Sequence, residues 1–445
     1  MVPRPIRRRC HGAVLWLCLT LLFAGALGLH LLFAAGQAYA ARERLDTAAD
    51  AAAWSAALWQ ARVLNFQAYA NRAIVAQEAA IAQSVALASW SRHFAAFAGT
   101  MAVSWPAVSA ALGVAAEVAA AGRDLAEQAA GESIAGRAAG IAQLLAGQEL
   151  LQRAVGTFAA GAVANEVARS TDTRLFAFAL PVAEPVIPTR RFTGGERERL
   201  ADVVRRSLDD FVRGPRGLDL TIFGLPSACF GHPLAGPEAW FSELHKRGGT
   251  MLESGLDRWE SGDTHSLHTW VPMRGLFGAF LGCRRVEAMP LGWGAAEAGP
   301  VIEGWLRTDP GGVRFNPVAS ALADAEMSTR SLPGAQAWSG IAAVRDLDPA
   351  RLADDRFPVA RIAILARDEG AAVRGAAGGL RGRLALPDRF AGGRLWSLAV
   401  AEVYFRPPPV DGERVEYASL YSPYWQARLA EPTEAERAQA RSHVR

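Results

Sequence analysis

The feature that most constrains this chain is an apolar run of 24 residues near its N-terminus, from Ala13 to Gly36. Its only ionisable members are Cys18 and His30. About 20 such residues span the hydrocarbon core of a bilayer as a helix. The run therefore predicts a transmembrane helix at residues 13–36, which makes the lipid bilayer one partner of the chain.

Positive charge is concentrated on one side of this run. Four arginines lie within residues 1–9, whereas the stretch from Arg42 to Asp50 carries basic and acidic residues together. The cytoplasmic flank of a membrane helix carries the excess of Arg and Lys. We therefore expect a single-pass protein of the bacterial inner membrane, with residues 1–12 as a basic cytoplasmic N-terminus and the bulk of the chain periplasmic.

A cleaved secretory signal is the alternative interpretation of the same run. Ala38, Tyr39 and Ala40 have the small-x-small form that a signal peptidase accepts. The apolar region of a signal usually spans about 7–15 residues. The run is longer than that, which favours its retention as an anchor.

The segment after the apolar run favours helix. Gln37 to Ala98 contains neither Gly nor Pro and is rich in Ala, Leu, Gln, Arg and Glu. After an interruption at Gly99–Pro106, a second Ala-rich region extends to Arg169. We expect a periplasmic helical arm over residues 37–170, built as an antiparallel hairpin. Apolar or small residues in its first half recur at spacings of four and three, which is a heptad seam: Leu45, Ala49, Ala52, Ala56, Trp59, Val63 and Phe66.

Periodicity leaves two interpretations of this seam open. The seam is either the core side of an ordinary helical domain or a partner-binding surface that forms a coiled coil with another subunit, including a homo-oligomer. The polar residues beside the seam support pairing with a neighbouring helix under either interpretation: Asn65, Gln67, Asn71, Arg72, Gln77 and Glu78.

Beyond Ser170 the pattern changes to short apolar runs separated by Pro and Gly. This pattern predicts a periplasmic α+β domain over residues 171–430, with a largely antiparallel sheet, followed by a polar C-terminal tail at 431–445. The expected strands include Leu175–Leu180, Ser266–Val271, Arg361–Ala366 and Leu395–Phe405. One helix is expected at Glu196–Val212, because Leu200, Val203, Val204, Leu208 and Phe211 share one face.

The four cysteines divide between compartments. Cys10 precedes the apolar run and Cys18 lies inside it, so only Cys229 and Cys283 would reach the periplasm. A pair of thiols in an oxidising compartment is usually bridged. We expect a disulfide between these two residues.

Composition and motifs argue against several kinds of function. A net charge of +3 is far from the basic face of a nucleic-acid binder, so we expect no nucleic-acid partner. The best enzyme-like cluster runs from Asp263 to His268, with His232 and His245 upstream. In a strand, His265 and His268 would point to opposite faces, which does not suit a zinc site. The chain has no nucleophile elbow, Walker loop or Cys-x-x-Cys motif. We expect no catalytic residues, metal or cofactor.

Part of the sequence resembles a known family. Arg44–Ala53 reads RLDTAADAAA and follows a basic start and Gly12. The continuation includes Trp59–Tyr69 (WQARVLNFQAY), and a further stretch, Tyr421–Leu429 (YSPYWQARL), has the same character. These stretches resemble the TadE/TadG-like proteins of tight-adherence (Tad) systems, which assemble Flp pili. The resemblance covers about the first 95 residues well.

The resemblance implies a non-enzymatic, membrane-anchored component or assembly factor of a Flp/Tad-type pilus. Its implied partners are other membrane proteins of the pilus system and pilin-like subunits. Two features depart from family patterns: cleavage after Gly12 would place Leu17 where a pilin carries Glu, and Asp219–Ile222 lacks the Asp-x-Ser-x-Ser run of a von Willebrand-type metal site. The alternative function is a periplasmic enzyme or metalloprotein on a membrane-anchored helical stalk.

Overall fold

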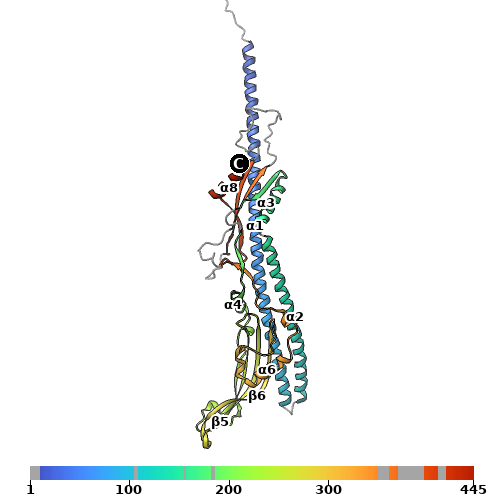
Figure 1. The fold of residues 1–445 in the computed structure, drawn as a ribbon, viewed down its shortest axis with the longest axis vertical. Coiled ribbons are helices and arrows are strands. Elements are labelled where there is room, and N and C mark those ends of the chain that lie inside the picture. The colour runs from blue at the N-terminus through green and yellow to red at the C-terminus, as the bar shows by residue number, and fades with distance from the viewer. Residues whose placement is uncertain are drawn as a thin grey trace, which may run out of the picture. The chain divides into compact units, whose positions relative to one another are not determined.

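The computed structural model describes residues 11–104, 109–154, 157–181, 186–348, 360–368, 395–408 and 417–444. It is an α+β protein with one long N-terminal helix and antiparallel sheets (Figure 1). The helices are α1 His11–Ser104, α2 Ser109–Ala154, α3 Thr157–Thr171, α4 Glu198–Ser207, α5 Asp210–Arg213, α6 Pro317–Thr329 and α8 Glu434–Val444. The larger strands are β1 Leu175–Ala179, β3 Leu218–Pro226, β4 Phe241–Leu252, β5 Trp259–Arg274, β6 Phe280–Ala298, β8 Ala360–Asp368, β9 Leu395–Phe405 and β10 Trp425–Ala430.

Shorter elements connect these. Strands β2 Thr189–Arg191 and β7 Arg345–Leu347 form a two-stranded sheet. The 3₁₀ turns are η2 Gly194–Arg197, η3 Pro237–Ala239, η4 Leu276–Gly278, η5 Pro310–Phe315 and η6 Ala335–Ala337.

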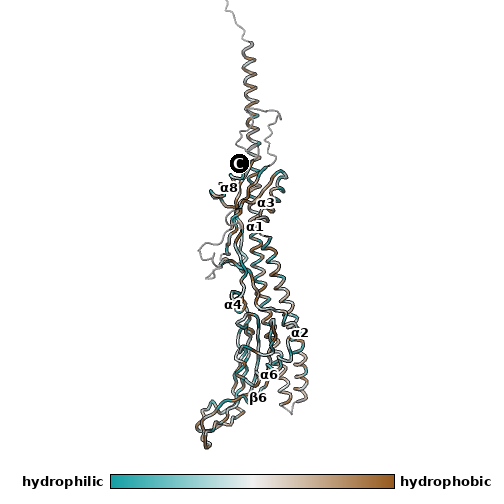
Figure 2. The backbone as a smooth tube through the Cα atoms, viewed as in Figure 1, coloured by the Kyte–Doolittle hydropathy of each residue, from teal (hydrophilic) through white to brown (hydrophobic). Residues whose placement is uncertain are grey.

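Helix α1 has 94 residues and continues from the apolar run into the Ala-rich segment without interruption. It is the one helix, among the residues described, that is long and apolar enough to cross a membrane. The large apolar side chains of its first turns, such as Leu22 and Phe23, are exposed in the chain. Figure 2 shows this N-terminal part of α1 mostly in the hydrophobic colour. The interruption expected at Gly99–Pro106 begins later than predicted, because α1 extends to Ser104; residues 105–108 lie outside the described part.

The predicted helical hairpin forms between α1 and α2. Side chains of the two helices are paired at Asn71–Gln148, at Ser84–Ser133 and at Arg92–Glu127. As the residue number increases along α1, the number of the paired residue on α2 decreases. This order is the signature of antiparallel packing.

The chain folds into two units, each built from separated segments. Unit 1 comprises the described parts of residues 1–68, 150–189 and 347–445, and unit 2 those of residues 69–149 and 190–346. The two units therefore do not correspond to the predicted helical arm and distal domain, which meet at residue 170. Each unit combines helical segments from the first part with strands from the second. The predicted polar tail at 431–445 contributes helix α8 to unit 1.

Unit 1 is built on an antiparallel sheet with the order β1-β8-β9-β10. Its register pairs Ala177 with Ala366, and Ile362 with Ala401. Alanines of α1 and α3 are buried in one core cluster with side chains of this sheet. A second cluster joins Ala440 of α8 to other strand residues. Strand β9 has the bounds that the sequence predicts.

Unit 2 is built on an antiparallel meander with the order β3-β4-β5-β6. A small core joins this sheet to α6, with Ala295, Leu306, Val313, Ala323 and Met327 buried together. Part of α1 contacts the same sheet, because a Cβ built on Gly294 would overlap the backbone of Ser89 and His93.

The helix expected at Glu196–Val212 is interrupted. Leu208 is extended, with ψ 144°, and divides the segment into α4 and α5. The side chain of Asp209 accepts a hydrogen bond from the backbone N–H of Val212 at 2.9 Å. An Asp in this position caps a new helix, and this local bond competes with continuation of the first.

The contact at Gly294 gives a test of unit 2. We expect Gly294→Ala to lower its free energy of unfolding by about 1–3 kcal/mol, because the added methyl group would overlap helix backbone rather than a flexible side chain. Gly122→Ala on α2 is the control: its Cβ would meet open space, and alanine favours helix. Thermal unfolding of the detergent-solubilised chain measures both. Equal melting temperatures for the two variants would show that α1 does not approach the sheet this closely.

Candidate functional site

The predicted partner-binding seam lies in the core of unit 1. Leu45, Ala49, Ala52 and Ala56 are fully buried against the chain's own strands and α3. Val63 is buried, Trp59 is half-buried, and Phe66 is exposed. A side chain buried in this way cannot contact another subunit unless the unit opens. The buried positions of the seam are therefore the core side of a domain, and their interpretation as a partner surface is corrected; Phe66 lies outside this core.

The two stretches that carry the family resemblance meet in unit 1. The Asn65 side chain donates from Nδ2 to the carbonyl oxygen of Trp425 at 2.9 Å, and its Oδ1 accepts from the N–H of Trp425 at 3.0 Å. Trp425 begins β10, which is the last strand in the sheet order. Asn65 thus satisfies backbone groups that an edge strand would otherwise present to another chain.

The other polar residues beside the seam are also paired within the chain. In unit 1, Gln67 donates to Gln152 at 2.8 Å. In unit 2, Gln148 donates to Asn71 at 2.7 Å, and Asn71 donates to the carbonyl of Arg345 at 2.8 Å. Gln67 and Asn71 therefore pair with a neighbouring helix, as predicted, and this helix is α2 of the same chain.

Glu78 is a buried carboxylate on the same helix. Its oxygens accept from the indole N–H of Trp338 at 2.9 Å and from the backbone N–H of Ala342 at 3.0 Å. Burial raises the pKa of Glu78 to about 7; the two donors and the more distant Arg197 act in the opposite direction. The carboxyl group therefore titrates near neutral pH.

Charged side chains continue the buried network farther along α1. Ser89 donates to Asp263 at 2.9 Å, and Asp263 also accepts from Arg216 at 2.7 Å. The Arg92 guanidinium pairs with Glu127 at 2.7 Å and donates to the Ala295 carbonyl. Each buried charge thus has an opposite charge beside it, which is what a stable buried ion requires.

The histidines considered for a zinc site are held by different groups. His245 lies beside Asp219 at 2.5 Å and Glu243 at 2.9 Å. His268 contacts Asn316 at 2.9 Å. His265 instead stacks against His93 of α1, with the ring centroids 5.9 Å apart. Within the described ranges, no three His, Cys, Asp or Glu side chains are grouped to hold a metal ion.

His93 and His265 form a desolvated pair. Burial lowers the pKa of each to about 4. Both ring nitrogens of His93 are buried without a hydrogen-bond partner among the residues described. The two rings are therefore neutral at pH 7 and pack as aromatic groups.

The predicted disulfide is present: Cys229 and Cys283 are bonded, with Cα atoms 6.5 Å apart. It ties the loop after β3 to strand β6.

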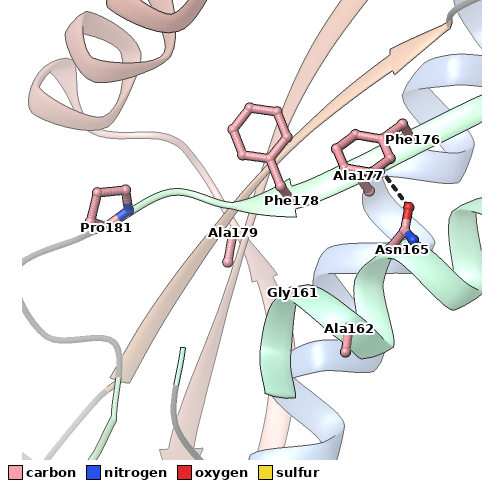
Figure 3. Close-up of a pocket in the computed structure, with 8 residues that line it drawn as sticks. All are labelled: Gly161, Ala162, Asn165, Phe176, Ala177, Phe178, Ala179 and Pro181. Carbon is pink, nitrogen blue, oxygen red and sulfur yellow. Dashed lines mark hydrogen bonds between the residues drawn. The ribbon is translucent and has the colours of Figure 1, made fainter. Parts of the chain in front are cut away.

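A shallow groove of about 460 Å³ lies between α3 and β1 in unit 1 (Figure 3). Phe176 and Phe178 line it from the strand, and Gly161 and Asn165 from the helix. The side chain of Asn165 accepts from the N–H of Ala177 at 3.3 Å. The polar group in the groove is thus already paired with the backbone, and the remaining lining is apolar.

One exposed surface was missed by the sequence analysis. Leu87, Trp90 and Phe94 are exposed large side chains of α1 within unit 2, and the rings of Trp90 and Phe94 stack at 5.6 Å. Spacings of three and four place all three on one helix face. We call these three residues the α1 stripe. The spacing was available in the sequence, but periodicity does not reveal which face of a helix the rest of the chain covers.

Comparison of the chain with protein families, with curated proteins and with solved structures finds no match.

The Asn65 contact can be tested by substitution. We expect Asn65→Ala to destabilise unit 1 by about 2 kcal/mol, because it leaves the N–H and C=O of Trp425 without their partner. Arg62→Ala, at an exposed position of the same helix, serves as the control. Urea unfolding followed by circular dichroism gives both values. If the urea midpoint of Asn65→Ala equals that of the control, the two hydrogen bonds to Trp425 do not stabilise unit 1.

Glu78 predicts a pH dependence of stability. Its folded pKa is raised, so its stabilising contribution is complete below pH 4.5 and is lost as pH rises through about 7. The stability of the wild type minus that of Glu78→Gln should therefore fall between pH 5 and pH 8, by up to about 3 kcal/mol. Denaturant unfolding at several pH values measures it, with exposed Glu117→Gln as the control. A flat or rising difference would refute the raised pKa.

Proposed function

We propose that this chain is a non-enzymatic, membrane-anchored component or assembly factor of a Flp/Tad-type pilus, with its N-terminus cytoplasmic and its bulk periplasmic. The observation that carries the proposal is the continuity of α1. Its first turns are apolar and uncovered, and the same helix then supplies buried residues to the folded chain. Such a helix joins a membrane anchor to a folded body without a loop.

Three further observations support this proposal. The stretches that resemble TadE/TadG-like proteins are structurally coupled through Asn65 and Trp425. The Cys229–Cys283 disulfide suits an oxidising compartment. The polar residues Asn65, Gln67, Asn71 and Glu78 of α1 form hydrogen bonds within the fold, which suits a scaffold rather than a reaction.

Topology is tested first, with reporters fused after Arg445. A reporter that is active only in the periplasm should be active there. Activity of a cytoplasm-only reporter at the same position would refute the orientation.

The α1 stripe is the proposed contact for another helix of the pilus system. An apolar row at spacings of three and four is the pattern by which one helix docks on another. Its two aromatic side chains are of the kind that dominates binding energy at protein interfaces. The stripe replaces the buried seam as the candidate partner surface.

We expect a Trp90→Ser, Phe94→Ser double variant to lose crosslinking to neighbouring pilus-system proteins and surface adherence while accumulating at normal levels. Loss of an aromatic hot spot costs about 2 kcal/mol or more, roughly thirtyfold in affinity. Val103→Ser, at another exposed position of α1, is the matched control. Ala52→Glu should instead lower the amount of protein, because Ala52 is in the core. Normal crosslinking and adherence of the double variant would refute the stripe as an assembly contact.

A further inference from the structure

The end of the unit 2 sheet presents an unusual concentration of exposed apolar side chains. We call this end the apolar tip, and it combines the β5–β6 turn with the end of β3 and the loop that follows. Figure 1 shows the β5–β6 hairpin extending at this end. Its exposed members are Phe223, Leu225, Phe230, Leu234, Leu276, Phe277 and Leu281.

The turn itself projects its side chains outward. Phe277 is 100% exposed and Leu276 is 83% exposed. Phe277 adopts a left-handed backbone conformation, with φ 68°, followed by Gly278 at φ 80°. A non-glycine residue in this region stores backbone strain. An apolar side chain held under this strain, in full contact with water, is a candidate for a functional contact.

The apolar tip is a built structure and not a loose loop. The Cys229–Cys283 disulfide joins the loop after β3 to β6. The rings of His232 and Phe280 stack at 3.8 Å across the same junction. Phe230 packs edge-on against Phe241 at 5.4 Å. These contacts hold the exposed side chains in place before any partner arrives.

The β5–β6 turn of the tip carries charge of one sign, whereas the loop after β3 contains Glu238. Residues 271–286 contain three arginines and neither Asp nor Glu. Arg274 and Arg284 are exposed on either side of the turn. Arg285 lies over the Trp270 ring at 5.8 Å. Apolar side chains are thus flanked by cations, and an aromatic residue lies behind them.

We propose that the apolar tip inserts into an anionic lipid surface. Leu and Phe side chains that project together enter the boundary between headgroups and acyl chains without requiring a pocket. Arginines beside them attract anionic headgroups, and a Trp behind them suits the interface. The charge complementarity favours a lipid surface over a second copy of the chain, whose own tip would carry the same positive charge. This proposal does not depend on the proposed role in a pilus.

The test uses the full chain, held through α1 in nanodiscs of neutral lipid. These are mixed with vesicles of phosphatidylcholine alone, or of phosphatidylcholine with phosphatidylglycerol, and flotation measures recruitment. We expect recruitment to the anionic vesicles, weakening at high salt. A Leu276→Ser, Phe277→Ser variant should lose about tenfold in affinity for each side chain removed. An Arg274→Gln, Arg284→Gln variant should lose roughly fivefold for each arginine, on anionic vesicles only.

Val301→Ser removes an exposed apolar side chain elsewhere in unit 2 and should leave recruitment unchanged. Circular dichroism checks that each variant is folded. We expect folded variants, because Phe277 is fully exposed. The proposal would be overturned if the wild-type protein is not recruited to anionic vesicles. It would also be overturned if the Leu276→Ser, Phe277→Ser variant is recruited as well as the wild type. Self-association of nanodiscs that depends on Phe277 and needs no vesicles would also overturn it, and would assign the tip to a second copy of the chain.

Discussion

Close approach between helix α1 and the strands that pack on it is the constraint on which the rest of the structure depends. In unit 1 the contact surface of α1 is a row of alanines, and the facing sheet also contributes alanines such as Ala177 and Ala401. In unit 2 the same close approach needs Gly294, where any side chain would overlap the helix backbone. Small residues release little free energy each by burial. Specificity of the packing must therefore come from other groups.

Buried polar contacts supply that specificity. Asn65 pairs with Trp425, Asn71 with Gln148, and Glu78 with Trp338. Each contact satisfies directional donors and acceptors in only one register, so a shifted helix would leave buried polar groups unpaired. A long alanine helix has many nearly equivalent registers, and these contacts distinguish one of them. The same demand explains why these polar residues of α1 are used by the fold itself.

The distribution of buried and exposed apolar side chains in the described residues bears on function. The stretches that resemble a family motif contribute buried residues such as Leu45, Ala52 and Trp425, whereas exposed large apolar side chains are present on the first turns of α1, the α1 stripe and the apolar tip. Large exposed apolar groups in a folded chain usually mark contacts with membranes or other proteins. These exposed regions are the basis of the contacts proposed above.

Much of the local structure followed from the sequence alone. The helix over the apolar run, the helix from Gln37 to Ala98 and the strand Leu395–Phe405 each depend on the composition of neighbouring residues, so local sequence patterns were sufficient to predict them. The disulfide was predicted because only Cys229 and Cys283 lie beyond the N-terminal apolar run and an oxidising compartment was expected for them. The interruption at Leu208 was not predicted. In the sequence, the apolar periodicity of this segment is a stronger signal than one capping residue, Asp209.

What the sequence could not determine is which segments meet. The heptad seam allowed a domain core or a subunit contact, and only the strands from beyond residue 340, packed on it in unit 1, decided for the core. The predicted boundary at residue 170 does not coincide with the division into two units for the same reason, since both units join segments far apart in the chain. Periodicity fixes the apolar face of a helix because it depends on the local geometry of the backbone. The identity of what covers that face depends on contacts between distant residues, and those exist only in the folded chain.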